Sequence, residues 1–348
     1  MPYCVSLDGL RAVAILLVLL FHAQVPVFPG ANVGVDVFFV LSGYLITRIL
    51  LAEHQASGTL DLRRFYRQRL WRLTPPLLLL LLLYAVCAPL LWPDYYLFFH
   101  IRDWIVVLIY QADLALVFGM GPDKMTHAWS LAIEERFYLL WPLALLGLLA
   151  LRNLRAALVL LLAALLLVSL WRLMALQLWD VSGNEAYYRF DMRLSGLLLG
   201  AWLGLWVGCG LPVSERLLRR HWLLLAWLAL LAVVLYPTGD KGRLSFGLPL
   251  VEAAVLFTLL WLHQRPQGLL GRALAWSPLV YVGQLSYGLY LFHYPAMAYL
   301  KLLYPWWVTL LGGAAVALLL AIFSYHLIER PIRRWRKAGG WVGGSAAA

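Results

Sequence analysis

Charged residues are scarce in this sequence. Asp, Glu, Lys and Arg make up 13% of its 348 residues, whereas an ordinary soluble protein has about 25%. Hydrophobic residues make up 63%. So little charge in a chain of this length excludes an ordinary water-soluble domain and predicts an integral membrane protein in a lipid bilayer.

Cysteine is also rare. Cys4, Cys87 and Cys209 stand alone, and no Cys-x-x-Cys spacing occurs. This pattern argues against a disulfide framework and a zinc site, and we expect no bound metal. The net charge of +11 comes from arginines between hydrophobic runs rather than from one basic domain. Such charges are typical of membrane topology signals, so nucleic acid is not an expected partner.

Ten hydrophobic segments approach the roughly 20 residues needed to span a bilayer. They predict an all-α, polytopic membrane protein with about ten transmembrane helices in one bundle. We predict a single domain at residues 1–338 and a disordered tail at 339–348, which is rich in Gly and Ala. The predicted spans are residues 5–25, 34–51, 74–92, 128–150, 156–178, 188–207, 221–237, 246–263, 278–300 and 307–328.

A further apolar segment, residues 101–118, is interrupted by the letters YQAD. We predict an interfacial or re-entrant helix there. Most Lys and Arg residues between the spans then fall on one side of the membrane. Because cytoplasmic loops carry the positive excess, both termini are predicted to be cytoplasmic.

The first span contains three ionisable residues within LDGLRAVAILLVLLFHA, residues 7–23. Such groups are costly in a bilayer and usually mark a site. Arg11 and His22 share one helix face and lie roughly 16 Å apart along the axis. Asp8 and Arg11 are equally well explained as an interfacial pair. His22 is a natural general base near neutral pH.

Two acidic residues of other spans are further candidates, and Asp36 is close in depth to His22. Asp36, near the start of the second span, could orient the His22 imidazole and stabilise its cation. The helix dipole explains an N-terminal Asp equally well. Glu134 follows His127 by seven positions, so the two should be nearly eclipsed on one helix face. A carboxylate at that depth needs a partner or a function.

Basic residues outside the first span are further candidates. Arg69 and Arg72 lie in an amphipathic loop, DLRRFYRQRLWRLTPP, that suits either phosphate groups or anionic lipid. Arg189, Asp191 and Arg193 open the sixth span. Their charges are explained equally by structural pairing with Glu134 and by contact with substrate.

The ninth span contains the second deep histidine. The sequence GQLSYGLYLFHYPA places Tyr287 and His293 there. A buried structural role and a functional role explain His293 about equally well.

Together these motifs resemble the bacterial acyltransferase 3 family of inner-membrane sugar O-acyltransferases. The resemblance covers nearly all of residues 6–336, and the order and spacing of the motifs make it specific. The motifs are Arg11 and His22 separated by ten residues, GVDVFFVLSGYLIT, Arg69-x-x-Arg72, WSLAIEERFY, RFDMRLSGLLLG, LSYGLYLFHYP and IERPIRR.

The resemblance implies a membrane enzyme that uses acyl-CoA, usually acetyl-CoA, as a co-substrate. It would transfer the acyl group from the cytoplasmic donor to a hydroxyl of a glycan or glycolipid acceptor. A cell-surface or exported polysaccharide is the first-ranked acceptor. Some members carry a fused SGNH domain; this chain is expected to lack it and to transfer directly. An acyl-enzyme intermediate and a homo-oligomeric state both stay open.

Residue roles follow from the motifs and their predicted geometry together. Arg11, Arg69 and Arg72 are expected to bind the CoA phosphates. His22 is expected to be the catalytic base, oriented by Asp36 or another carboxylate, with Glu134 as a further catalytic residue. The expected substrate-binding residues are Arg189, Asp191, Arg193, Tyr287 and His293.

The main rival hypothesis is a transporter or flippase of a lipid-linked glycan, because intramembrane His, Arg and Glu also mark translocation paths. Transporters built from repeats show paired broken helices, and the sequence shows no such symmetry. A second rival, the unrelated membrane-bound O-acyltransferase class, also uses a histidine. The spacing of Arg11 and His22 favours the acyltransferase 3 family.

Overall fold

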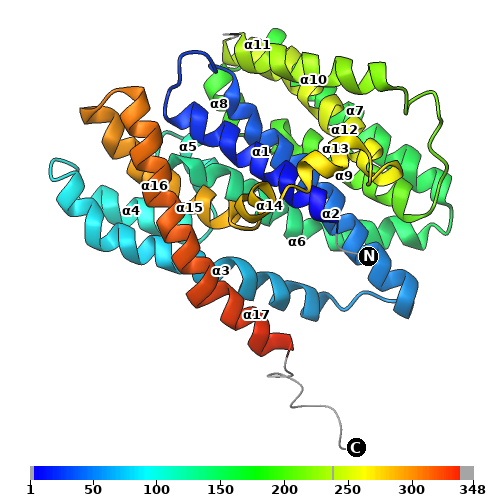
Figure 1. The fold of residues 1–348 in the computed structure, drawn as a ribbon, viewed down its shortest axis with the longest axis horizontal. Coiled ribbons are helices and arrows are strands. Elements are labelled where there is room, and N and C mark those ends of the chain that lie inside the picture. Colours follow the sequence, from blue (N-terminus) through cyan, green and yellow to red (C-terminus); the bar gives the residue numbers. More distant parts are fainter. Residues whose placement is uncertain (1–3, 237–238, 338–348) are drawn as a thin grey trace, which may run out of the picture.

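The computed structural model describes residues 4–236 and 239–337, which contain helices and no β-strand (Figure 1). The predicted all-α fold is therefore confirmed, while the predicted tail at 339–348 lies outside the described residues. The helical elements are α1 (Val5–His22), η1 (Ala31–Val33), α2 (Gly34–Ser57), α3 (Leu62–Leu91), α4 (Leu97–Leu108), α5 (Ala112–Val117), η2 (Thr126–Ala128), α6 (Trp129–Ala150), α7 (Leu154–Gln177), α8 (Gly183–Tyr188), α9 (Phe190–Gly208), α10 (Arg220–Leu235), α11 (Asp240–Gly242), η3 (Arg243–Gly247), α12 (Leu248–Gln264), α13 (Leu269–Leu274), α14 (Ser277–Gln284), α15 (Ser286–Leu303), α16 (Trp306–Ser324), η4 (Tyr325–Glu329) and α17 (Arg330–Lys337).

Seven helical segments of the described chain are long and apolar enough to cross a membrane. They contain α1, α2, α3, α7, α9, α12 and α16. The three other predicted spans are also helical and correspond to α6, α10 and α15. These helices are not both long enough and apolar enough to be counted with the seven. Helix α10 has 16 residues, and α6 carries Glu134, Glu135 and Arg136 in its first half. The number of ten spans stays a prediction.

The arginine-rich stretch before the third span is helical rather than a loop. A single helix, α3, runs from Leu62 to Leu91, and the Asp61 side chain caps it by accepting a 2.8 Å hydrogen bond from the Arg64 backbone N–H. Pro75 and Pro76 lie inside this helix without ending it. The helix thus begins before the predicted span, which starts at residue 74, and Arg69 and Arg72 lie three positions apart on one helix face.

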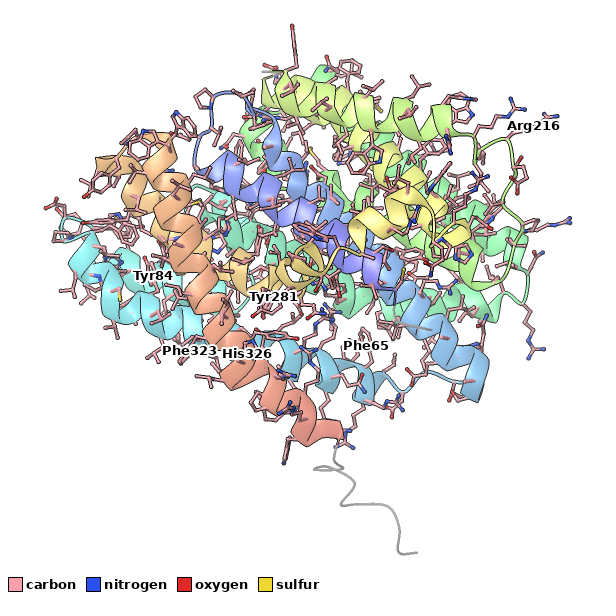
Figure 2. The ribbon with its side chains drawn as sticks, viewed as in Figure 1. Phe65, Tyr84, Arg216, Tyr281, Phe323 and His326 are labelled. Atoms are coloured by element: carbon pink, nitrogen blue, oxygen red, sulfur yellow. The ribbon has the colours of Figure 1, made fainter. Side chains whose placement is uncertain are left out.

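The predicted span at 278–300 is broken into two helices. Helix α14 ends at Gln284 and α15 begins at Ser286. The break occurs where α14 meets the first turns of α1, because a Cβ atom on Gly283 would lie 1.8 Å from the Asp8 carbonyl oxygen. Tyr281 of α14 also makes a 3.2 Å hydrogen bond with His326 of η4, and Figure 2 labels both side chains. Helix α14 therefore contacts both α1 and η4.

The segment at residues 101–118 is interrupted, as predicted. Helix α4 ends at Leu108, and α5 begins at Ala112 after Tyr110 adopts a left-handed φ of 54°. Twelve residues of α4 extend about 18 Å, well short of a bilayer core of about 30 Å. An interfacial or re-entrant position for this segment stays a prediction.

Helices α2 and α9 pack closely through glycine. A Cβ atom on Gly43 would lie 2.0 Å from the Leu197 carbonyl oxygen, and one on Gly200 would lie 2.0 Å from the Val40 carbonyl oxygen. The two backbones can approach this closely only because neither position has a side chain. This contact fixes the position of Asp36 on α2 relative to Arg193 on α9.

Replacing Gly200 with alanine is expected to destabilise the protein by about 1–3 kcal/mol, because the added methyl group would force α2 and α9 apart. The measurement is the thermal unfolding midpoint of the purified protein in detergent. Gly147→Ala is the matched control, since a Cβ atom there meets no atom within 4 Å. Equal midpoints for the two variants would contradict this account of the contact.

Candidate functional site

A cavity of about 530 Å³ lies beside the last turn of α1. We call it the histidine cavity, because His22 lines it from α1 and His127 lines it from η2. Its volume falls within the range of about 300–1,000 Å³ that is usual for small-molecule sites. Most of the remaining wall is aromatic or amide-bearing: Phe21, Phe28, Trp129, Tyr187, Tyr188, Tyr290, Tyr294, Gln24, Asn32 and Asn184.

His22 contacts the backbone of its own helix and a second histidine. Its Nδ1 lies 3.0 Å from the Val18 carbonyl oxygen and 3.2 Å from Nε2 of His293. In the described part of the chain, nothing hydrogen-bonds to Nε2 of His22. One ring nitrogen of His22 is therefore open to a molecule bound in the histidine cavity.

Asp36 does not pair with His22, which corrects the expected arrangement. Its carboxylate accepts a 2.6 Å hydrogen bond from Arg193, and both side chains are buried. A buried guanidinium attracts a nearby carboxylate strongly because neither group is hydrated. The structure thus places Asp36 and Arg193 in a structural ion pair, not beside the His22 imidazole and not free to bind substrate.

This ion pair belongs to a larger buried network. The Arg172 side chain donates a 2.7 Å hydrogen bond to Ser195, whose hydroxyl donates in turn to Glu252. Arg172 is fully buried, and Glu252 is nearly so. Two arginines and two carboxylic acid side chains are therefore buried together between α2, α7, α9 and α12.

Glu134 does not line the histidine cavity. It accepts 3.1 Å hydrogen bonds from the hydroxyls of Ser42 and Tyr138. His127 belongs to η2 rather than to α6, and its Nε2 donates to the Leu291 carbonyl oxygen at 3.1 Å. Glu134 and His127 were expected to lie on one face of a single helix. They belong to two different helical elements instead.

The three residues predicted to bind the CoA phosphates lie near one another at the other end of α1. We call this region the arginine end, comprising Arg11, Arg69 and Arg72. Arg69 lies over the Tyr138 ring and 3.8 Å from Glu135. Arg72 is exposed and within electrostatic range of both other arginines. The three guanidinium groups thus lie within electrostatic range of one another, and Asp8 and Glu135 lie 3.8 Å from Arg11 and Arg69, respectively.

Tyr287 lies at the arginine end rather than beside the histidines. Its hydroxyl donates a 2.9 Å hydrogen bond to the Leu73 carbonyl oxygen of α3. It is also within electrostatic range of Arg72. Tyr287 and His293 are only six positions apart on α15, but they therefore belong to different regions of the structure.

Arg189 and Asp191 pair with each other at the start of α9. Arg189 donates to Asp191 at 2.8 Å and to Glu185 at 3.1 Å, and Asp191 also accepts from the Trp171 indole N–H. Neither residue lines the histidine cavity. Their alternative pairing with Glu134 does not occur. These contacts favour a structural role for both residues.

His127 is a cavity residue that the sequence predictions did not include among the site residues. Its ring stacks on Tyr294, with centroids 5.0 Å apart, and is almost completely buried. Burial lowers the pKa of His127 well below its usual range, and the neighbouring His293 and His22 rings lower it further. Its place in the THAWS stretch, just before α6, was the available indication.

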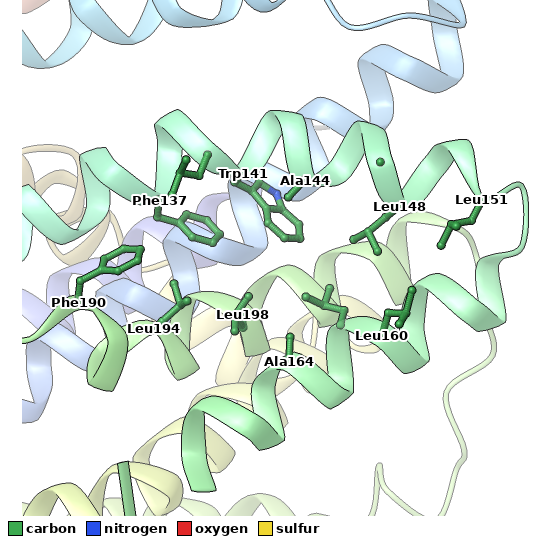
Figure 3. Close-up of a pocket in the computed structure, with 13 residues that line it drawn as sticks. Phe137, Trp141, Ala144, Leu148, Leu151, Leu160, Ala164, Phe190, Leu194 and Leu198 are labelled. Carbon is green, nitrogen blue, oxygen red and sulfur yellow. The ribbon is translucent and has the colours of Figure 1, made fainter. Parts of the chain in front are cut away.

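A second cavity, of about 440 Å³, lies between α6, α7 and α9 (Figure 3). Its walls are entirely apolar, and Figure 3 shows Phe137, Trp141, Leu194 and Leu198 facing into it. No side chain that lines it can transfer a proton or bind a phosphate. The histidine cavity is consequently the better candidate for chemistry.

Comparison with known proteins identifies the family of the chain. Residues 5–326 match the family described as "Acyltransferase domain", Acyl_transf_3. The chain belongs to the acyltransferase 3 family. No solved structure is significantly similar to it.

Relatives of the chain include named O-acetyltransferases. It is 32% identical over 352 residues to O-acetyltransferase OatA of Staphylococcus aureus, 34% over 354 residues to YrhL of Bacillus subtilis, and 30% over 357 residues to peptidoglycan O-acetyltransferase OatA of Listeria monocytogenes. Each match covers 95% of this chain. The chain spans 57%, 55% and 56% of the three relatives, respectively.

Proposed function

We propose that this chain is an O-acyltransferase that moves an acyl group from acyl-CoA to a sugar hydroxyl of a cell-surface polysaccharide. Acetyl is the acyl group that we propose. The observation that carries the proposal is the open Nε2 of His22 in the histidine cavity. The relatives support a cell-wall glycan such as peptidoglycan as the acceptor. We place the protein in the bacterial inner membrane, with both termini in the cytoplasm.

The chemistry requires two proton transfers through His22 and the replacement of a carbon–sulfur bond by a carbon–oxygen bond. His22 Nε2 takes the proton of the acceptor hydroxyl as its oxygen attacks the thioester carbonyl carbon. The bond between carbon and sulfur then breaks, and the thiol of CoA leaves with the proton returned from His22. Holding both substrates in attack geometry supplies a further part of the rate.

The two ends of α1 suit the two substrates. The three cations of the arginine end match the phosphates of CoA, and the pantetheine arm would extend toward His22 over roughly 16 Å of helix. The aromatic and amide side chains of the histidine cavity match the apolar faces and hydroxyls of a sugar ring. Glu134 lies between them, within electrostatic range of Arg69 and Arg11.

Transfer from radiolabelled acetyl-CoA in inverted membrane vesicles tests the proposal. We expect label to accumulate in a glycan only when acetyl-CoA is supplied on the exposed cytoplasmic face. Export of an unlabelled glycan without dependence on acetyl-CoA would instead support a transporter and overturn the assignment.

Arg69→Ala combined with Arg72→Ala is expected to raise the KM for acetyl-CoA by about 10- to 100-fold, through the loss of charge-assisted hydrogen bonds to phosphate. The readout is initial transfer rate against acetyl-CoA concentration. Arg63→Ala with Arg64→Ala is the matched control, because these two arginines are exposed one to two turns earlier on the same helix. An equal rise in KM for both double variants would show that lost positive charge in general weakens acetyl-CoA binding, and would contradict a specific phosphate site at Arg69 and Arg72.

A further inference from the structure

His293 is a fully buried histidine whose hydrogen-bonding partners determine where its hydrogen lies. Its Nδ1 is 2.7 Å from the Tyr290 carbonyl oxygen and 3.1 Å from the Leu289 carbonyl oxygen. A carbonyl oxygen can only accept a hydrogen bond. Nδ1 of His293 must therefore carry the hydrogen.

The second nitrogen of His293 is then an acceptor. No carboxylate of the described residues hydrogen-bonds to this buried ring, so the neutral imidazole is favoured over a buried, unpaired cation. A neutral ring with its hydrogen on Nδ1 has a lone pair on Nε2. That lone pair faces Nδ1 of His22 at 3.2 Å.

Both neighbours of His22 Nδ1 are consequently acceptors. The Val18 carbonyl oxygen is one, and His293 Nε2 is the other. We propose that His293 is a positioning residue that holds His22 in the tautomer with its hydrogen on Nδ1, so that Nε2 faces the cavity as the proton acceptor. This inference rests on the proposed function and gives His293 the orienting role expected of Asp36.

The same contact stabilises the charged state of His22 during reaction. The proton of the acceptor hydroxyl bonds to His22 Nε2, while the hydrogen on Nδ1 stays in place. The resulting imidazolium keeps both of its acceptors without any rearrangement. Hydrogen bonds to a charged donor are stronger than neutral ones, so His293 contributes more after proton transfer than before it.

Nitrogen-15 NMR of the full chain, labelled at histidine, tests the tautomer directly. His22→Gln identifies the His22 signals by their disappearance. We expect wild-type His22 to show a protonated Nδ1 and an unprotonated Nε2. Finding the hydrogen on Nε2 in the wild-type protein would overturn the proposal, whatever the activity.

Two substitutions of His293 separate positioning from folding. His293→Phe keeps a ring but removes the acceptor, whereas the side-chain oxygen of His293→Gln can accept in place of Nε2. We expect the Phe variant to lower kcat by about 10- to 100-fold, the size of one hydrogen bond to a charged group, and to mix the His22 tautomers. We expect the Gln variant to recover at least part of both readouts.

His100→Phe is the control for loss of a buried histidine, since His100 bonds to Tyr84 rather than to the cavity residues. An unchanged His22 spectrum and kcat in the Phe variant would overturn the positioning role. If the wild-type tautomer is as expected but no acyl transfer can be detected, the proposed function fails while the arrangement of the two histidines stands.

Discussion

Replacing His22 with alanine is expected to lower acyl transfer by about 100- to 10,000-fold, the usual contribution of a positioned general base. The His22 imidazole lines the histidine cavity with an open ring nitrogen, and without it the acceptor hydroxyl loses its positioned proton acceptor. The measurement is the initial rate of transfer to glycan in inverted vesicles at equal protein content. We expect the KM for acetyl-CoA to change little, because the arginine end is roughly 16 Å away.

His54→Ala is the control for this variant, since His54 lies in the last turn of α2 and does not line the cavity. Both variants should insert in the membrane and unfold at similar temperatures. Transfer by His22→Ala within a few fold of wild type would remove His22 as the base. The Tyr and Ser hydroxyls near the cavity would then become the groups to test for an acyl-enzyme.

Replacing Asp36 with asparagine is expected to destabilise the protein by about 3–5 kcal/mol, because it leaves the buried Arg193 guanidinium without its counter-charge. Arg172 is a second buried arginine within electrostatic range of Arg193, so the uncompensated positive charge would be felt there as well. The effect should appear as a lower thermal unfolding midpoint in detergent and as a lower yield of folded protein.

Two further variants test the physical cause of that loss. Asp36→Asn combined with Arg193→Gln restores neutrality, so we expect it to be more stable than Asp36→Asn alone. Asp191→Asn removes a half-exposed partner of Arg189 and should cost at most about 1 kcal/mol. A double variant no more stable than the single one would contradict charge compensation between Asp36 and Arg193. Strong transfer activity in a folded double variant would show that Asp36 takes no part in catalysis.

The role of Asp36 shows where sequence reasoning stopped. Depth along a span placed Asp36 near His22, and that estimate used only residue counts. Two side chains at one depth can face opposite ways, because each helix can rotate about its own axis. The close α2–α9 contact through Gly43 and Gly200 turns Asp36 toward Arg193 instead.

His22 itself and the separation of the two ends of α1 could be predicted from the sequence. Arg11 and His22 lie on one continuous helix, so their separation follows from helical geometry alone. The all-α fold and the positions of most helices were similarly accessible, because the length and spacing of hydrophobic runs are properties of the local chain. The beginning of α3 was not, since the polar, arginine-rich stretch before the apolar run was expected to be a loop and is helical.

The sequence by itself therefore determined a helical membrane protein of the acyltransferase 3 family with an ionisable face on its first helix. Only the tertiary structure decided which residues meet there. His293 follows His22 by 271 positions, and His127 enters from a third element. Their contact depends on how separate helices rotate and pack against one another, and no spacing within a single helix specifies that packing.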